Sequence, residues 1–166
     1  NATNLNKEYR ILLSKFSNLN IVCSIDGYDF VNKYIRWPAD WSTIIENVHG
    51  LTEITSGVSF NITVSIWNIS NLSKLIFFLE KEFPNRSILL NDVMWPPHQK
   101  FEAFPDKSVA LKDLELIKTS SHYINDPSFK SKLDFYINTI SNTKLDLKIL
   151  KDFFQFNDRL DRSRDV

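Results

Sequence analysis

The sequence predicts an α/β fold in which three parallel strands alternate with helices and an all-helical region follows. Three short runs rich in branched apolar residues lie well apart along the chain. Between these runs lie stretches long enough for crossover helices, which parallel strands require. No further strand pattern occurs after Pro105. Three strands are too few for a closed barrel, so we expect a half-barrel or a small open sheet.

The first helix and the first strand are predicted within residues 5–25. Residues 5–16 carry apolar side chains at steps of three and four, which is typical of a helix with one buried face, and Asn4 is placed to cap it. Residues 20–25 form an apolar run that ends in polar residues. This pattern indicates a buried strand.

The next segment predicts two helices and the most regular strand. A helical turn over residues 28–35 ends before Pro38, and Asp40 is placed to cap a helix over 41–51. Residues 58–67 alternate apolar and polar side chains and are rich in Val, Ile, Phe and Thr. That alternation predicts the second strand.

The third strand follows one further helix. Residues 71–83 are amphipathic and stop at Pro84, which predicts a helix. Residues 87–93 predict the third strand, and the two prolines within residues 94–97 favour an extended turn after it.

Helices alone are predicted beyond Pro105. Apolar residues recur at helical spacing over residues 107–119, 127–140 and 145–160. We therefore expect an α/β part over residues 1–105 and a helical C-terminal region over residues 106–166.

Composition excludes several classes of function. Twenty basic and twenty acidic residues give zero net charge, so the chain has no net positive charge that would attract nucleic acid or an anionic membrane. No apolar run reaches membrane-spanning length, and no secretory signal opens the sequence. The single cysteine excludes a disulfide framework and a thiolate-bound metal built from this chain alone. We expect a reducing, cytoplasmic environment.

Both ends of the sequence predict a fragment of a longer protein. The opening Asn1 to Asn4 lacks an initiator methionine and is typical of a loop already under way. The closing residues 161–166 follow a helical pattern without a terminating segment.

Polar and aromatic side chains follow each predicted strand. The carboxyl ends of parallel strands meet at one edge of a sheet, where ligands commonly bind. A hydroxyl, carboxylates, amides and indoles there suit a ligand with hydroxyls, an amino acid group and a flat ring. The alternative is that the Asn and Asp residues only cap the following helices and turns. The residues at the three strand ends are Ser24, Asp26, Gly27, Trp67, Asn68, Asn91, Asp92 and Trp95.

Arg36 has two possible roles. It is the first arginine after Gly27, and it could fold back over the strand ends to bind a carboxylate with its forked guanidinium. Alternatively it stacks on Trp37 or pairs with Asp40 at the surface.

Other chemistry finds little support, and we assign no catalytic residue and no metal ligand. His49, His98 and His122 lie in separate elements without ligand spacing. Cys23 lies inside an apolar strand, where a thiol behaves as a small buried hydrophobe. The three dispersed glycines cannot form a phosphate-binding loop.

Several segments resemble the second half of a radical S-adenosylmethionine (SAM) domain. The opening residues are similar to the end of that family's Thr-Asn-Gly-Thr segment, with Ala2 in place of glycine. The closing residues resemble the C-terminal region of its twitch-type members. The matching segments are residues 1–3, 24–27, 34–36 with Trp41, 62–72 with Asn68 and Leu72, 91–97 and 153–164.

The resemblance implies a partial (β/α)6 barrel that binds SAM on a [4Fe–4S] cluster and cleaves it to a 5′-deoxyadenosyl radical. It implies that Ser24 and Asp26 lie near the SAM ribose or carboxylate, that Arg36 pairs with the SAM carboxylate, and that Asn68 lies near the ribose. Residues expected in the substrate pocket are Trp67, Asn91 and Trp95. The substrate itself, a small molecule or a peptide, is not identified.

The features of the family's N-terminal half do not occur in this chain. The cluster-binding C-x-x-x-C-x-x-C loop and the Gly-Gly-Glu segment are absent, and no cysteine after Cys23 could hold an auxiliary cluster. We therefore expect the chain to be inactive without the N-terminal half of the same protein. The alternative is a stand-alone, non-catalytic α/β module that binds a small molecule or a protein. An unpaired, apolar outer edge over residues 21–25 would indicate the fragment, and a covered edge the module.

Overall fold

The computed structural model describes residues 2–164 and contains one open sheet of three parallel strands. The strands are β1 (Asn20–Ser24), β2 (Gly57–Val64) and β3 (Ile88–Asp92), in the spatial order β1-β2-β3. Cys23 lies opposite Phe60 and Ile62 lies opposite Leu90 in the parallel register. The predicted α/β class, with three parallel strands alternating with helices, is confirmed.

Each strand is shorter than the sequence pattern predicts. The largest difference is at β2, which ends at Val64 instead of continuing to Trp67. The cause is local, because the Ser65 amide donates to the side-chain Oδ1 of Asn68 over 2.8 Å. That bond bends the chain into a turn directly after the strand.

Four helices lie between or before the strands: α1 (Lys7–Leu13), α2 (Phe30–Ile35), α3 (Trp41–Ile54) and α4 (Leu72–Glu82). Asp40 caps α3 as predicted, accepting from the Thr43 amide over 3.0 Å. The predicted cap of the first helix is wrong. Asn6, and not Asn4, accepts from the Tyr9 amide over 2.9 Å, and α1 accordingly starts later.

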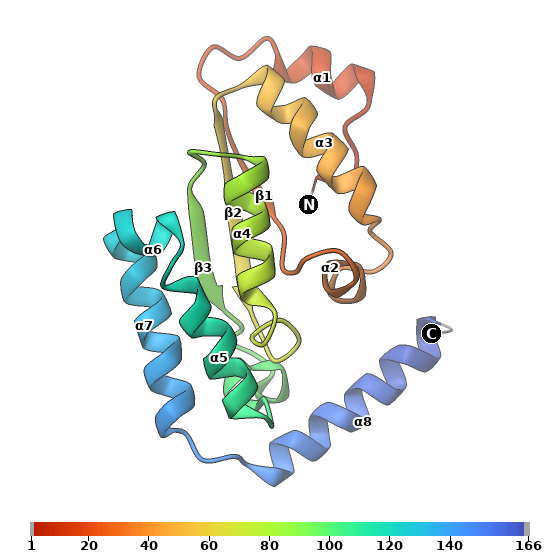
Figure 1. Ribbon diagram of the computed structural model, residues 1–166. Coiled ribbons are helices and arrows are strands. Elements are labelled where there is room, and N and C mark those ends of the chain that lie inside the picture. The colour runs from red at the N-terminus through yellow and green to blue at the C-terminus, as the bar shows by residue number, and fades with distance from the viewer. Residues whose placement is uncertain (1, 165–166) are drawn as a thin grey trace.

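The remaining elements are helical. After the short 3-10 turns η1 (Pro97–Gln99) and η2 (Phe101–Ala103) come α5 (Lys107–Ile117), α6 (Ser121–Asn125), α7 (Pro127–Asn142) and α8 (Leu147–Arg164). The sequence pattern gave no indication of α6, which is a short helix capped by Ser120. Figure 1 shows α8 set apart from the other helices, running away from the foot of the sheet.

One face of the sheet forms the core. Alternate residues of β2, namely Val58, Phe60, Ile62 and Val64, are buried there together with apolar residues of α3, α4, α5 and α7. The core is therefore continuous across residue 105, and the C-terminal helices α5 and α7 pack on the same sheet as the helices before them.

The opposite face of the sheet is open. Val22 of β1 is 54% exposed and Leu89 of β3 is 49% exposed, and the β2 residues between them on this face, Ser59 and Asn61, are only partly buried. Parallel sheets are normally covered by other elements on both faces. A half-covered parallel sheet is the most unusual feature of this fold.

The outer edge of β1 is also unpaired. β1 bonds to β2 on one side, and within residues 2–164 no strand lies on its other side. The edge is mixed in character, since Val22 is exposed whereas Cys23 and Ile25 are buried in the core.

No helix in the described part of the chain is both long and apolar enough to cross a membrane.

Candidate functional site

Asp26 is fixed at the end of β1 by contacts with four other residues, one of which is Asn68. Its Oδ2 lies 2.7 Å from Arg36 Nη2, and its Oδ1 accepts from the Thr63 amide over 2.8 Å. Its own amide donates to Asn32 Oδ1 over 2.9 Å. The Asp26 side chain is only 7% exposed, so this ion pair is largely shielded from water.

Asn68 connects the ends of β1 and β2. Its Nδ2 donates to the Asp26 carbonyl over 2.6 Å and to the Thr63 carbonyl over 2.9 Å. Its Oδ1 accepts from the Ser65 amide. Because Asn68 is buried, these bonds satisfy backbone groups that water does not reach.

Gly27 allows the chain to turn closely around α2. A Cβ at this position would lie 2.5 Å from Val31 Cγ1 and 2.8 Å from the Asn32 nitrogen. Only glycine fits this approach without displacement, and the approach brings Asn32 under the Asp26 amide.

Burial dominates the electrostatics of this cluster. Desolvation raises the pKa of Asp26 above its ordinary value, although the Thr63 amide and the Arg36 guanidinium both act to lower it. Burial therefore favours the neutral form of the Asp26 carboxyl, whereas the Thr63 amide and the Arg36 guanidinium favour its ionised form.

A cavity of about 250 Å³ lies beside this cluster, at the carboxyl ends of the strands. One wall comes from the strand ends and the turn after β2, a second from the segment after β3, a third from α2, and a fourth from α8. The lining residues are Asp26, Tyr34, Ile35, Thr63, Ser65, Trp67, Val93, Gln99, Phe156, Leu160 and Arg164.

Polar contacts attach α8 to the rest of this site. The Trp67 indole nitrogen donates to Asn157 Oδ1 over 3.2 Å, and the Tyr34 hydroxyl donates to Asp161 Oδ1 over 2.7 Å. Arg164 Nη1 donates to the Tyr34 carbonyl over 2.6 Å. Burial and the neighbouring Asp161 together raise the pKa of Tyr34 to about 12, so its hydroxyl stays protonated as a donor.

The structure brings three of the four predicted cofactor-binding residues into direct contact. Asp26, Arg36 and Asn68 form one bonded cluster. Ser24 is partly buried at the end of β1. Arg36 does fold back onto a carboxylate, and that carboxylate belongs to Asp26, while Asp40 is engaged in capping α3.

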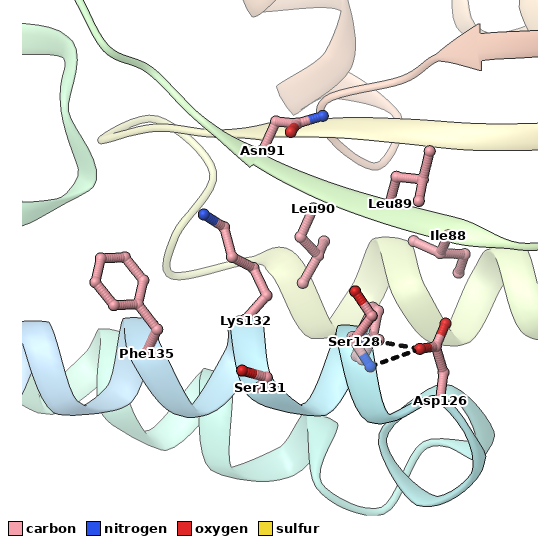
Figure 2. A pocket seen from close by; sticks show the side chains of 10 residues that line it. Ile88, Leu89, Leu90, Asn91, Asp126, Ser128, Ser131, Lys132 and Phe135 are labelled. Carbon is pink, nitrogen blue, oxygen red and sulfur yellow. Dashed lines mark hydrogen bonds between the residues drawn. The ribbon is translucent and has the colours of Figure 1, made fainter.

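The predicted substrate-pocket residues are separated. Trp67 lines the cavity, whereas Trp95 is 78% exposed and is not among the lining residues. Asn91 lies on β3 with its side-chain amide bonded to Asn61, and it borders a different hollow of about 630 Å³ between β3 and α7. Figure 2 shows this second hollow, with Leu90 pointing from β3 toward α7 and Lys132 rising from the helix.

Sequence analysis missed several residues of the site. Thr63 acts through its backbone amide, which no side-chain pattern reveals. Asn32 lies in the short helix α2, where it is buried. In the sequence the only indication was an amide side chain shortly after Gly27. The contacts of Asp161 and Arg164 bridge more than 120 residues, and nothing local in the sequence indicates them.

The residues present do not fit an iron–sulfur cluster. Cys23 is 1% exposed in the core, and burial raises the pKa of its thiol, which disfavours the thiolate that metals require. Within residues 2–164 no group of three histidine, cysteine or acidic side chains is arranged to hold a metal ion.

Comparison with known proteins does not assign the chain. No protein-family model matches it, and neither a curated protein nor a solved structure is significantly similar to it.

Proposed function

We propose that this chain is the C-terminal portion of a radical SAM enzyme and contributes contacts to the cofactor's ribose and carboxylate. The observation that carries the proposal is the convergence of Asp26, Arg36 and Asn68 beside a cavity at the carboxyl ends of parallel strands. Such ends are where α/β folds bind ligands.

The open sheet face supports the proposal. Val22 and Leu89 are exposed on one face of the sheet, although both faces of a parallel sheet are normally buried. In a complete barrel this face would lie in the interior, where both side chains would be covered. The unpaired outer edge of β1 supports it as well, since a preceding strand of a barrel would pair there.

Arg36 has a clear role under this proposal. Its guanidinium pairs with Asp26, which lines the cavity, while Arg36 itself lines a neighbouring hollow of about 360 Å³. A guanidinium is well suited to bind a carboxylate. The carboxylate of SAM would compete with Asp26 for this cation. Trp67 and Phe156, which also line the cavity, supply flat apolar surface for a ring.

The cluster chemistry cannot come from this chain, because Cys23 is its only cysteine. In the proposed enzyme the N-terminal half supplies the cluster ligands. The chain by itself is then inactive, and its residues only bind and orient the cofactor and shape the wall of a substrate pocket for a small molecule or peptide. We also propose a reducing, cytoplasmic location.

The test begins with the coding sequence upstream of Asn1, which should contain three clustered cysteines. The whole protein is then reconstituted anaerobically, and iron and 5′-deoxyadenosine are measured. Arg36→Gln should weaken SAM binding by about tenfold or more, because a charge-assisted bond is lost. The matched control is Arg159→Gln, since Arg159 is exposed and bonds only within α8. No 5′-deoxyadenosine from a cluster-loaded enzyme would overturn the proposal.

A stand-alone binding module is the second candidate. It is favoured by the bonds that Asp26 already makes to Arg36 and to Asn68 within the chain. An upstream sequence without cysteines, together with a stable monomer made from residues 1–166 alone, would favour this candidate.

A further inference from the structure

We propose that α8 is a detachable strap that closes one side of the cavity and holds α2 in position. α8 contributes no residue to the main core. In the described chain its single buried residue is Phe153, which packs with Ile66 and Ala103 in a small separate cluster. The first half of α8 is thus anchored by a few apolar contacts.

The second half of α8 is held by polar contacts to α2, which we call the latch: Tyr34, Asp161 and Arg164. The Tyr34 hydroxyl donates to Asp161 over 2.7 Å, and Arg164 donates to the Tyr34 carbonyl over 2.6 Å. The Arg164 guanidinium also lies 5.5 Å from the centre of the Tyr34 ring. Water can replace such partly exposed hydrogen bonds, so their net contribution to stability is small. The latch therefore opens more easily than the apolar contacts around Phe153 in the first half of α8.

The latch is linked to the Asp26 cluster through α2. Tyr34 belongs to α2, and Arg36, at the C-cap of the same six-residue helix, makes the ion pair with Asp26. α2 buries only Asn32, and its N-cap Asp29 makes no capping bond through its side chain. Closure of the latch therefore restrains a helix that has few other restraints.

Opening of the latch would change the cavity. Phe156 and Leu160 of α8 line it together with Arg164, so a detached second half removes that wall. α8 follows a segment without regular structure at residues 143–146, which leaves room for movement. The inference goes beyond the proposed function, since it requires no particular ligand.

The experiment measures distances between two spin labels by pulsed electron paramagnetic resonance. Labels are placed at Lys81→Cys in α4 and Arg162→Cys in α8, both exposed positions. Native Cys23 is buried and stays unlabelled, which mass spectrometry verifies. The latch is then weakened in the full chain by Tyr34→Phe or Asp161→Ala.

We expect each latch variant to lower the ratio of docked to undocked α8 about tenfold, seen as a second, displaced distance population. The double variant should shift the ratio no further than the stronger single one, because both remove the same hydrogen bond. The matched control is Asp158→Ala, which removes an exposed carboxylate of α8 that makes no hydrogen bond or ion pair within residues 2–164 and should change nothing.

Two results overturn the proposal. In the first, Tyr34→Phe gives the same distance distribution as Asp158→Ala, and the latch is then dispensable. In the second, Tyr34→Phe exposes Cys23 to labelling, and the contact then belongs to the core fold and not to a strap. Neither outcome depends on SAM binding, so failure here is distinct from failure of the proposed function.

Discussion

Replacing Asn68 by alanine removes four hydrogen bonds at the junction of β1 and β2, three of them buried and one partly buried. The Asp26 carbonyl, the Thr63 carbonyl, and the amide and hydroxyl of Ser65 each lose the partner that the Asn68 side chain provides. Leaving a buried polar group unsatisfied costs about 1–3 kcal/mol. The residues around the gap relax and admit water, so we expect the free energy of unfolding to fall by about 3–5 kcal/mol.

Urea unfolding followed by circular dichroism measures this loss. The control is Asn71→Ala, which removes the same side chain three residues later, where it bonds only to the neighbouring Ser70 over 3.3 Å. We expect this control to lose less than about 0.5 kcal/mol. Equal stability of the two variants would refute the conclusion that Asn68 joins the strand ends.

Three further predictions concern the core and its periphery. Gly27→Ala should lower the free energy of unfolding by about 1–3 kcal/mol, measured in the same assay, because its Cβ would lie 2.5 Å from Val31 Cγ1. Burial acts to raise the pKa of Glu80, but hydrogen bonds from His122 and Ser121 lower this pKa overall. Glu80 therefore contributes stability above the pKa of an unfolded glutamate, and this contribution is lost as the pH falls through the pKa of Glu80 in the folded chain. Glu80→Gln should flatten this acid dependence in thermal melts between about pH 5 and pH 3, whereas an unchanged slope contradicts the assignment. Cys23 should react with iodoacetamide only when the chain unfolds, since burial both shields its thiol and raises its pKa; rapid alkylation in buffer would show that the core is open.

The elements with a strong local pattern were predictable from the sequence. The alternation through Phe60 and Ile62 identified β2, and Asp40 identified the start of α3, because side-chain period and capping are local properties. The sequence could not place the end of β2, since the turn there depends on the bond that Asn68 makes to Ser65.

The candidate site was predictable only in part. Residues that follow the strands, such as Asp26 and Asn68, converge because parallel strands end at one edge of the sheet. Their partners could not be foreseen. Whether a polar side chain meets a ligand or a neighbouring backbone group depends on packing, and the link from Tyr34 to Asp161 joins positions 127 residues apart.

The incomplete sheet has a practical consequence for the isolated chain. Both β1 and β3 are edge strands of a sheet that has Val22 and Leu89 on its open face. Neither strand contains a proline or a lysine, the residues that commonly protect edges from pairing with other molecules. At high concentration we therefore expect molecules of this chain to associate strand to strand.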